Sequence, residues 1–380
     1  MKNHILFTVL CFAISSCSSG SSDKTVYFSP GEIWPDNNGI HINAHGGGIL
    51  KKGETYYWYG EHKIEGTQGN VAHEGVHCYS STDLVNWKDE GIVLKVVKGN
   101  PQSSVLVEGC IVERPKVIYN AKTDKYVMWF HYEPKGYGYE CSYSGVAISD
   151  SPTGEFKLLH YGRQNAGCVP LNGLPKHGKG AYDPRKGYNG AELPQHPDSL
   201  NLITRDFDGG QMARDMTLFV DDDGKAYHIY SSEHNSTLHI SLLTEDYTNY
   251  SGVYTRHFVG RFMEAPAMFK YNDIYYLIMS GCTSWAPNPG RSAMATSVFG
   301  PWTELENPFW GDGSETSFRS QSTFVFPVQL EDKVQLIYMG DRWNPENAID
   351  GRYIWLPIQF NGNQPVIEWM GKWSLRNFEL

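Results

Sequence analysis

Acidic and amide side chains stand at the start of several apolar segments that are far apart in the sequence. They are Glu113, Asp215, Glu264 and Gln321, and His45 holds the corresponding place in the first such segment. If these side chains met in one cavity, burial and mutual repulsion would raise the pKa of one carboxyl group while another stayed ionised. A protonated acid close to an ionised carboxylate is the combination that hydrolysis of a glycosidic bond requires.

A strand pattern that recurs five times from Val26 onward would bring these residues together. Each unit has an apolar strand, a tight turn, an aromatic-rich strand and a polar strand, as in GGGILKKGETYYWYGEH followed by VHCYSSTDLVNW. Five such units predict an all-β fold, a five-bladed β-propeller; a long β-sandwich or two β-domains are the alternatives. Residues that tolerate hairpin dihedrals occupy the predicted turns. These turns are Gly53-Glu54, Asp124-Lys125, Asp223-Gly224 and Asn272-Asp273.

The first strand of each propeller blade lines the central axis, so the starts of the five units should face one shared cavity. The spacing is interrupted by a segment from Gly162 to Gly210 that is rich in Gly, Pro, Asn and His and shows little strand patterning. Long loops in compact domains are usually functional or mobile. We therefore expect this insert to form one wall of a substrate pocket.

Composition excludes several classes of function. The chain of 380 residues has 32 Lys and Arg against 42 Asp and Glu, a net charge of −10 that argues against nucleic-acid binding. No G-x-G-x-x-G or Walker-type run is present, so a nucleotide cofactor is not expected. Aromatic residues make up 14% of the chain, beside 39 Gly and 20 Pro, which favours short strands and tight turns over helical bundles.

The first residues have the form of an export signal. Lys2 is followed by an apolar stretch from Ile5 to Ile14 and then by Ser-Ser-Cys. The apolar stretch is too short to span a bilayer. Ile-Ser-Ser-Cys resembles a bacterial lipobox, so we expect residues 1–16 to be removed and Cys17 to carry a lipid anchor; ordinary signal-peptidase cleavage is the alternative. Residues 17–25 would be a Ser/Gly-rich tether and residues 26–380 the catalytic domain. The expected location is the periplasm or cell surface of a bacterium.

The remaining polar motifs give no reason to expect a metal or a disulfide framework. Beyond Cys11 and Cys17 there are five cysteines, so at most two disulfides can form. None of the five lies in a C-x-x-C pair, so a zinc site is not expected. His73 and His77 have i, i+4 spacing but lie in a strand-like segment. Asp221-Asp222-Asp223-Gly224 lacks the spacing of a calcium loop and predicts a hairpin turn.

The motifs at the starts of the units resemble glycoside hydrolase family 43, over nearly all of the mature chain. The resemblance implies that Glu264, in RFMEAPAMF, is the general acid and that Asp215, in ARDMTLFVDDDG, tunes its pKa and orients the substrate. The family's usual general base is an Asp in the first strand, but INAHGGGIL contains no carboxylate. The exo-β-1,3-galactanase branch also lacks that Asp. AHGGGI, ERPKVIYN, RDMTLF, EAPAMF and SQST all match its pattern.

Membership of this branch would make Gln321 the residue that holds the attacking water and acts as base, in its imidic tautomer. Glu113 would bind the sugar and help to set the water, and it competes with Gln321 for the role of base. The resemblance also implies galactose contacts for Tyr137, Asn235 and Thr283. His45, at the start of the first unit, is a further candidate sugar contact. Trp285 and Trp343, in Pro/Asn-rich segments, are candidate platforms for stacking sugar rings, with ordinary packing as the alternative.

We therefore expect a monomeric, exo-acting, inverting hydrolase that releases galactose from β-1,3-linked galactan, as in arabinogalactan. An α-L-arabinofuranosidase or another exo-glycosidase of the same fold is one alternative. A propeller that binds glycan without hydrolysing it is the other. The expected partner is an oligosaccharide or polysaccharide, and contact with a membrane would occur only through the lipid on Cys17.

Overall fold

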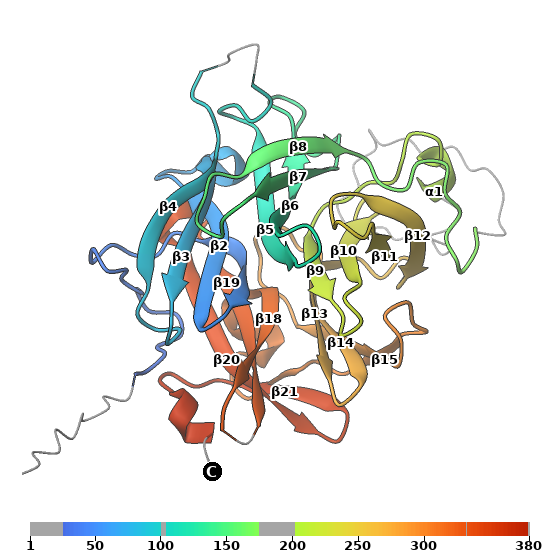
Figure 1. Ribbon diagram of the computed structural model, residues 1–380. Coiled ribbons are helices and arrows are strands. Elements are labelled where there is room, and N and C mark those ends of the chain that lie inside the picture. Colours follow the sequence, from blue (N-terminus) through green and yellow to red (C-terminus); the bar gives the residue numbers. More distant parts are fainter. Residues whose placement is uncertain (1–25, 100–103, 175–201, 332, 379–380) are drawn as a thin grey trace, which may run out of the picture.

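Five sheets surround one axis in the computed structural model, which describes residues 26–99, 104–174, 202–331 and 333–378 (Figure 1). The predicted five-bladed β-propeller is confirmed, and the sandwich and two-domain alternatives are wrong. In the first four sheets the strands pair antiparallel in sequence order. The fifth sheet has five strands, because β17 pairs parallel with β21 at its outer edge.

The strands of the first three blades have the following bounds. Blade 1 contains β1 (His45–Lys52), β2 (Thr55–Lys63), β3 (His73–Ser81) and β4 (Lys88–Lys95); blade 2 contains β5 (Ile111–Asn120), β6 (Lys125–Glu133), β7 (Tyr143–Ser149) and β8 (Lys157–Gly162); blade 3 contains β9 (Met216–Val220), β10 (Ala226–Ser232), β11 (Thr237–Leu243) and β12 (Tyr250–His257).

The last two blades complete the ring, and short helices occur only between strands or after the last one within the described ranges. Blade 4 contains β13 (Met263–Tyr271), β14 (Ile274–Gly281), β15 (Arg291–Ala295) and β16 (Thr303–Leu305); blade 5 contains β17 (Phe309–Trp310), β18 (Gln321–Gln329), β19 (Val334–Arg342), β20 (Arg352–Asn361) and β21 (Gln364–Glu368); the helices are η1 (Gly69–Val71), α1 (Leu202–Arg205), η4 (Ser314–Arg319), η5 (Ala348–Asp350) and η6 (Leu375–Phe378).

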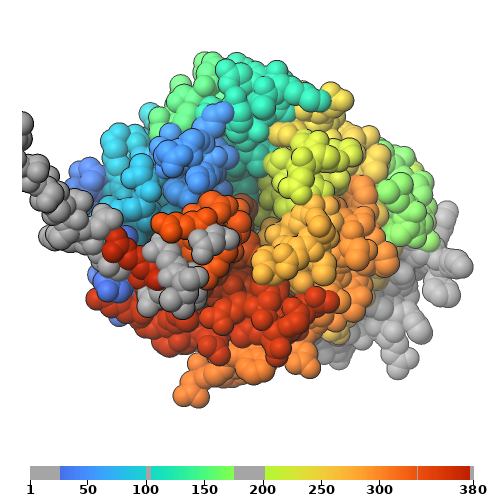
Figure 2. Space-filling model, turned by 60° about the horizontal axis from the view of Figure 1, so that its bottom comes forward, coloured from blue at the N-terminus to red at the C-terminus, as the bar shows by residue number. Residues whose placement is uncertain are grey.

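The predicted hairpin turns connect the first two strands of blades 1 to 4. Asn272 and Asp273 join β13 to β14 with φ values of 49° and 61°, the left-handed conformation that a two-residue hairpin loop requires. Gly53 joins β1 to β2 with φ of 60°, and Gly224 closes the β9–β10 turn with φ of 77°. These turns place the tips of the first hairpins together at one end of the molecule, where they surround a central hollow (Figure 2).

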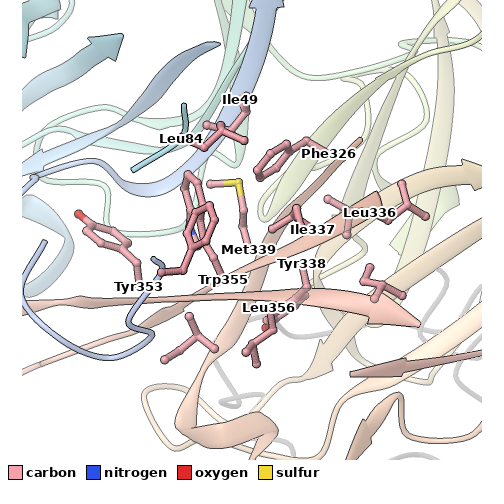
Figure 3. Packing of buried hydrophobic residues seen from close by; sticks show 14 of the residues in the cluster. Ile49, Leu84, Phe326, Leu336, Ile337, Tyr338, Met339, Tyr353, Trp355 and Leu356 are labelled. Atoms are coloured by element: carbon pink, nitrogen blue, oxygen red, sulfur yellow. The ribbon is translucent and has the colours of Figure 1, made fainter. Parts of the chain in front are cut away.

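The two ends of the described chain meet in the fifth blade and close the ring. Phe28 and Trp373 form an antiparallel bridge, and their rings stack with centroids 4.2 Å apart. The largest buried cluster lies beside this closure, between blades 1, 4 and 5, and its members are packed round Trp355, which is completely buried (Figure 3). The ring centroid of Trp355 lies 4.7 Å from that of Trp58 in blade 1, so the aromatic residues noted in the sequence hold neighbouring blades together.

The first strands β1, β5, β9, β13 and β18 pack side by side round the axis, as the propeller interpretation required. Two cavities lie at the two ends of these strands. The lower one, at the hairpin tips, has a volume of about 370 Å³ and a mostly apolar lining, with Lys116 among its residues. Arg114 belongs to the upper cavity. These two buried basic side chains on β5 therefore lie between the two cavities.

Candidate active site

A cavity of about 280 Å³ opens where the five first strands begin, and it contains most of the residues that the sequence singled out. All four predicted catalytic residues line it, as do three of the predicted sugar contacts. Its lining consists of Glu61, Asn70, Glu113, Arg114, His131, Tyr139, Arg214, Asp215, Asn235, Glu264, Ser284, Trp285, Gln321 and Trp343.

Irregularities in the first strands turn these side chains into the cavity. In β5 the register with β6 shifts after Glu113, and Arg114 adopts φ of 55° before Pro115. In β13 the register shifts after Glu264, and Ala265 adopts φ of 53° before Pro266. A β-bulge re-aims a side chain and interrupts the ladder, which makes it a suitable place for Pro. The Glu-x-Pro sequence, which occurs at residues 113–115 and 264–266, thus indicates a β-bulge that turns a carboxylate into the cavity.

Glu264 has the environment of a general acid. One carboxylate oxygen accepts hydrogen bonds from Asn235 Nδ2 at 2.5 Å and from Cys282 Sγ at 3.1 Å. Burial, followed by the nearby charge of Asp215, raises the pKa of Glu264 to about 7, although the Cys282 hydrogen bond opposes this shift. A carboxyl group with this pKa is protonated in a large fraction of molecules near neutral pH and can donate to a leaving oxygen.

Asp215 is held by two hydrogen-bond donors beside Glu264. Its Oδ2 accepts a hydrogen bond from Arg114 Nη2 at 3.1 Å and another from the backbone N–H of Ala265 at 3.0 Å. The second bond connects Asp215 directly to the bulge that carries Glu264. The negative charge of Asp215 next to Glu264 contributes to the raised pKa of Glu264.

Glu113 lies in a different electrostatic environment. Tyr139 donates to Oε1 at 2.6 Å, and His131 Nδ1 lies 2.9 Å from Oε2. Burial alone would raise the pKa of Glu113, but the hydrogen bond and charge of His131 lower it to about 2. Burial would lower the pKa of His131, but Glu113 on one side and Glu133, at 3.0 Å, on the other raise it to about 9. Glu113 is therefore a strongly held, ionised and weakly basic carboxylate.

Gln321 is fixed by three neighbours. Its Oε1 accepts hydrogen bonds from Arg114 Nη2 and, at 2.8 Å, from Trp343 Nε1, while its Nε2 donates to Ser280 Oγ at 3.1 Å. Two donors directed at Oε1 favour the ordinary amide, in which the oxygen accepts. The amide nitrogen carries a second N–H that can hold the oxygen of a water molecule. That Gln321 acts as the base remains a prediction.

Comparison with known proteins agrees with this geometry. The sequence model described as "Glycosyl hydrolases family 43" matches residues 192–321. The solved structure of a β-1,3-galactosidase, BT3683, is 47% identical and covers 91% of this chain and 100% of its own, with a TM-score of 0.84. The chain belongs to glycoside hydrolase family 43. No curated protein matches it.

Two further structures of the family extend the comparison. An exo-β-1,3-galactanase from Clostridium thermocellum is 35% identical over 91% of this chain and 66% of its own, with a TM-score of 0.72. An exo-β-1,3-galactanase from Phanerochaete chrysosporium, solved with β-1,3-galactotriose, is 31% identical over 92% of this chain and 68% of its own, with a TM-score of 0.71. This chain therefore spans about two thirds of the length of these two relatives.

Three predicted sugar contacts do not line the cavity of this family 43 protein. Tyr137 is 59% exposed, and Tyr139, two residues later, reaches Glu113 in its place. Thr283 donates its hydroxyl to the carbonyl of Ala286, and the adjacent Ser284 lines the cavity. His45 is completely buried against Tyr353, with ring centroids 5.5 Å apart.

The sequence did not single out several residues that line the cavity, chiefly Glu61, Arg114, Tyr139 and His131. Glu61 lies opposite His45 in the β1–β2 register and forms an ion pair with Lys63 at 2.6 Å. Arg114 carried a usable signal, because it follows Glu113 directly in the sequence. His131 carried none, since only the register of β5 with β6 pairs it with Glu113. Glu61 gave no comparable signal, since β2 alternates many polar and aromatic residues.

The predicted insert does not line the cavity through its described parts, residues 163–174 and 202–210. Arg205 in α1 instead lies 3.2 Å from His234, next to Asn235. Residues 175–201 lie outside the described residues, so their role in the pocket remains a prediction. Cys78, Cys110, Cys141, Cys168 and Cys282 are free thiols, and no cluster of three or more potential metal ligands occurs in the described part of the chain.

Two substitutions should move the alkaline limb of activity in opposite directions. Asp215→Asn removes the negative charge that raises the pKa of Glu264, so kcat/KM should begin to fall at a lower pH than the value of about 7 expected for the wild type. Cys282→Ala removes a hydrogen bond that stabilises ionised Glu264, so the fall should begin at a higher pH. Profiles of kcat/KM against pH measure both shifts, and an unmoved limb in both variants would contradict the assignment of Glu264 as the acid.

Proposed function

We propose that this protein is an exo-acting, inverting glycoside hydrolase that releases galactose from the end of β-1,3-linked galactan. The observation that carries the proposal is the pairing of a protonatable Glu264 with ionised carboxylates in one cavity, in a chain 47% identical to a β-1,3-galactosidase. Glu264 donates its proton to the glycosidic oxygen as that bond breaks. A water molecule attacks the anomeric carbon from the opposite face of the sugar.

The shape of the cavity supports action at a chain end. Arg114 and Lys116 lie between it and the apolar cavity at the other end of the axis. A glycan chain therefore cannot thread through the propeller along its axis, which favours entry of a chain end from the open side of the main cavity. Trp285 is 39% exposed, and its ring lies at 74° to that of Trp343 with the ring centroids 6.3 Å apart, so it presents an aromatic surface to the main cavity.

Polysaccharide digestion tests the activity directly. The wild type should release galactose from β-1,3-galactan and give little sugar from arabinan or xylan. Glu264→Gln should lower the rate on galactan by about 10²–10⁴-fold, because it removes general acid catalysis. Ion chromatography of the products gives the measurement. Release of arabinose in preference to galactose would favour the arabinofuranosidase alternative, and no release from any substrate would favour a glycan-binding protein.

We further propose that the protein is exported and anchored through a lipid on Cys17. The lipobox-like Ile-Ser-Ser-Cys and the polar tether support this proposal, and residues 1–25 lie outside the described residues. Within the described residues, no helix has the length and apolar character to cross a bilayer.

Membrane fractionation tests the anchor. The wild-type protein should sediment with membranes when it is produced in a bacterium, and Cys17→Ala should move it to the soluble fraction. Cys11→Ala, a change within the expected signal, is the matched control and should leave the protein with the membranes. Membrane association of Cys17→Ala would contradict the lipid anchor.

A further inference from the structure

The water side of the cavity has no evident strong base among the groups that line it. Both oxygens of Glu113 accept hydrogen bonds, and the pKa of Glu113 is lowered to about 2 by His131, against the effect of burial. Gln321 is an amide whose oxygen already accepts from Arg114 and Trp343. Glu61 is paired with Lys63 and accepts the backbone N–H of Arg114 at 3.0 Å. Removal of a proton from the attacking water therefore calls for another acceptor.

A second cavity lies directly beside the first. It has a volume of about 240 Å³ and shares Ser284, Trp285, Gln321 and Trp343 with the active-site cavity. Since a water molecule occupies on the order of 30 Å³, this side cavity can hold several. Ser280, Ser320 and Asn288 give it polar walls.

Asp341 lines this side cavity together with Gln321. The two residues are partners in the β18–β19 register, so their side chains project on the same face of the sheet. Asp341 is 2% exposed, and its Oδ2 accepts the backbone N–H of Gly46 at 2.5 Å. The carboxylate is thereby placed at the start of β1, the strand that has no carboxylate of its own.

We propose that Asp341 receives the proton of the attacking water, relayed through water in the side cavity past Gln321. This role rests on the proposed function of the main cavity. As the water oxygen bonds to the anomeric carbon, its O–H bond breaks and the proton passes to the Asp341 carboxylate. The bond to the leaving oxygen breaks at the same time, and Glu264 protonates that oxygen. Exchange with solvent then removes the proton from Asp341 and returns one to Glu264.

The basicity of Asp341 suits this role. Burial raises its pKa to about 7, while the Gly46 hydrogen bond and the charges of Arg114 and Lys116 oppose the increase and Glu61 adds to it. An acceptor with this pKa takes up a proton near neutral pH far more readily than Glu113. The other ionisable groups that face Asp341 or its cavity are Tyr338 of β19, Tyr353 of β20, Arg319 and Arg342.

Asp341→Asn tests the proposal, because the amide oxygen can still accept from Gly46. On an aryl β-galactoside that needs little help from the acid, kcat should fall by about 10²–10⁴-fold with little change in KM. The acidic limb of the wild-type pH profile should disappear. Azide, which attacks without giving up a proton, should restore the rate and yield the α-galactosyl azide.

Asp36→Asn is the matched control. Asp36 is also a buried carboxylate, and it accepts from the backbone of Asn38 at 2.7 Å and Ile40 at 3.1 Å, away from either cavity. This variant should keep the wild-type rate and pH profile. Two results would overturn the role of Asp341 and leave the proposed function intact, provided that the wild type is active. One is an unchanged acidic limb in the pH profile of Asp341→Asn. The other is a rate of Asp341→Asn that azide does not restore. A wild type inactive on every galactoside would overturn the proposed function and this inference together.

Carbon-13 NMR of labelled aspartate gives a second measurement, whose contradicting outcome needs only the wild-type protein. One carboxyl signal should titrate near pH 7, and it should be absent from the spectrum of Asp341→Glu. If every aspartate carboxyl titrated below pH 5, Asp341 could not be the acceptor.

Discussion

The guanidinium group of Arg114 is the contact on which the active site depends. It donates to the carbonyl of Ser322 at 2.8 Å, to Asp215 at 3.1 Å and to Gln321, and so connects blades 2, 3 and 5 at the top of the axis. The group is almost completely buried. A buried charge of this kind is stable only when hydrogen bonds and opposite charges compensate it. Loss of either the guanidinium group or its carboxylate partner leaves an uncompensated buried charge. Arg114 therefore fixes the relative positions of side chains that the chain itself places more than a hundred residues apart.

The cavity also holds its carboxyl groups in different electrostatic environments. Burial and Asp215 raise the pKa of Glu264 to about 7. His131 holds the pKa of Glu113 at about 2 despite its burial. Carboxyl groups of one chemical type thus take different protonation states through their neighbours alone, which is how a single cavity supplies both an acid and fixed negative charge.

Much of the fold and of the acid side could be predicted because the signals are local. The turn residues and the alternating strands repeat within each unit, and Glu-x-Pro at residues 113–115 and 264–266 indicates a bulge that presents a carboxylate. The rest depends on register and loop geometry. His45 and Glu61 are partners in the β1–β2 register, yet Glu61 lines the cavity while His45 packs against Tyr353, and the alternation of residues along the strands does not distinguish these two outcomes. Asp341 gave no signal, since only the pairing of β18 with β19 places it opposite Gln321.

A crystal structure of Glu264→Gln with β-1,3-galactobiose tests the central claim most directly. The account predicts the terminal galactose in the main cavity, with the substituted side chain within hydrogen-bond distance of the glycosidic oxygen. Gln321 should lie on the opposite face of the same ring, close to a water molecule facing the anomeric carbon. A disaccharide bound elsewhere, or one whose terminal ring does not lie between residues 264 and 321, would contradict it.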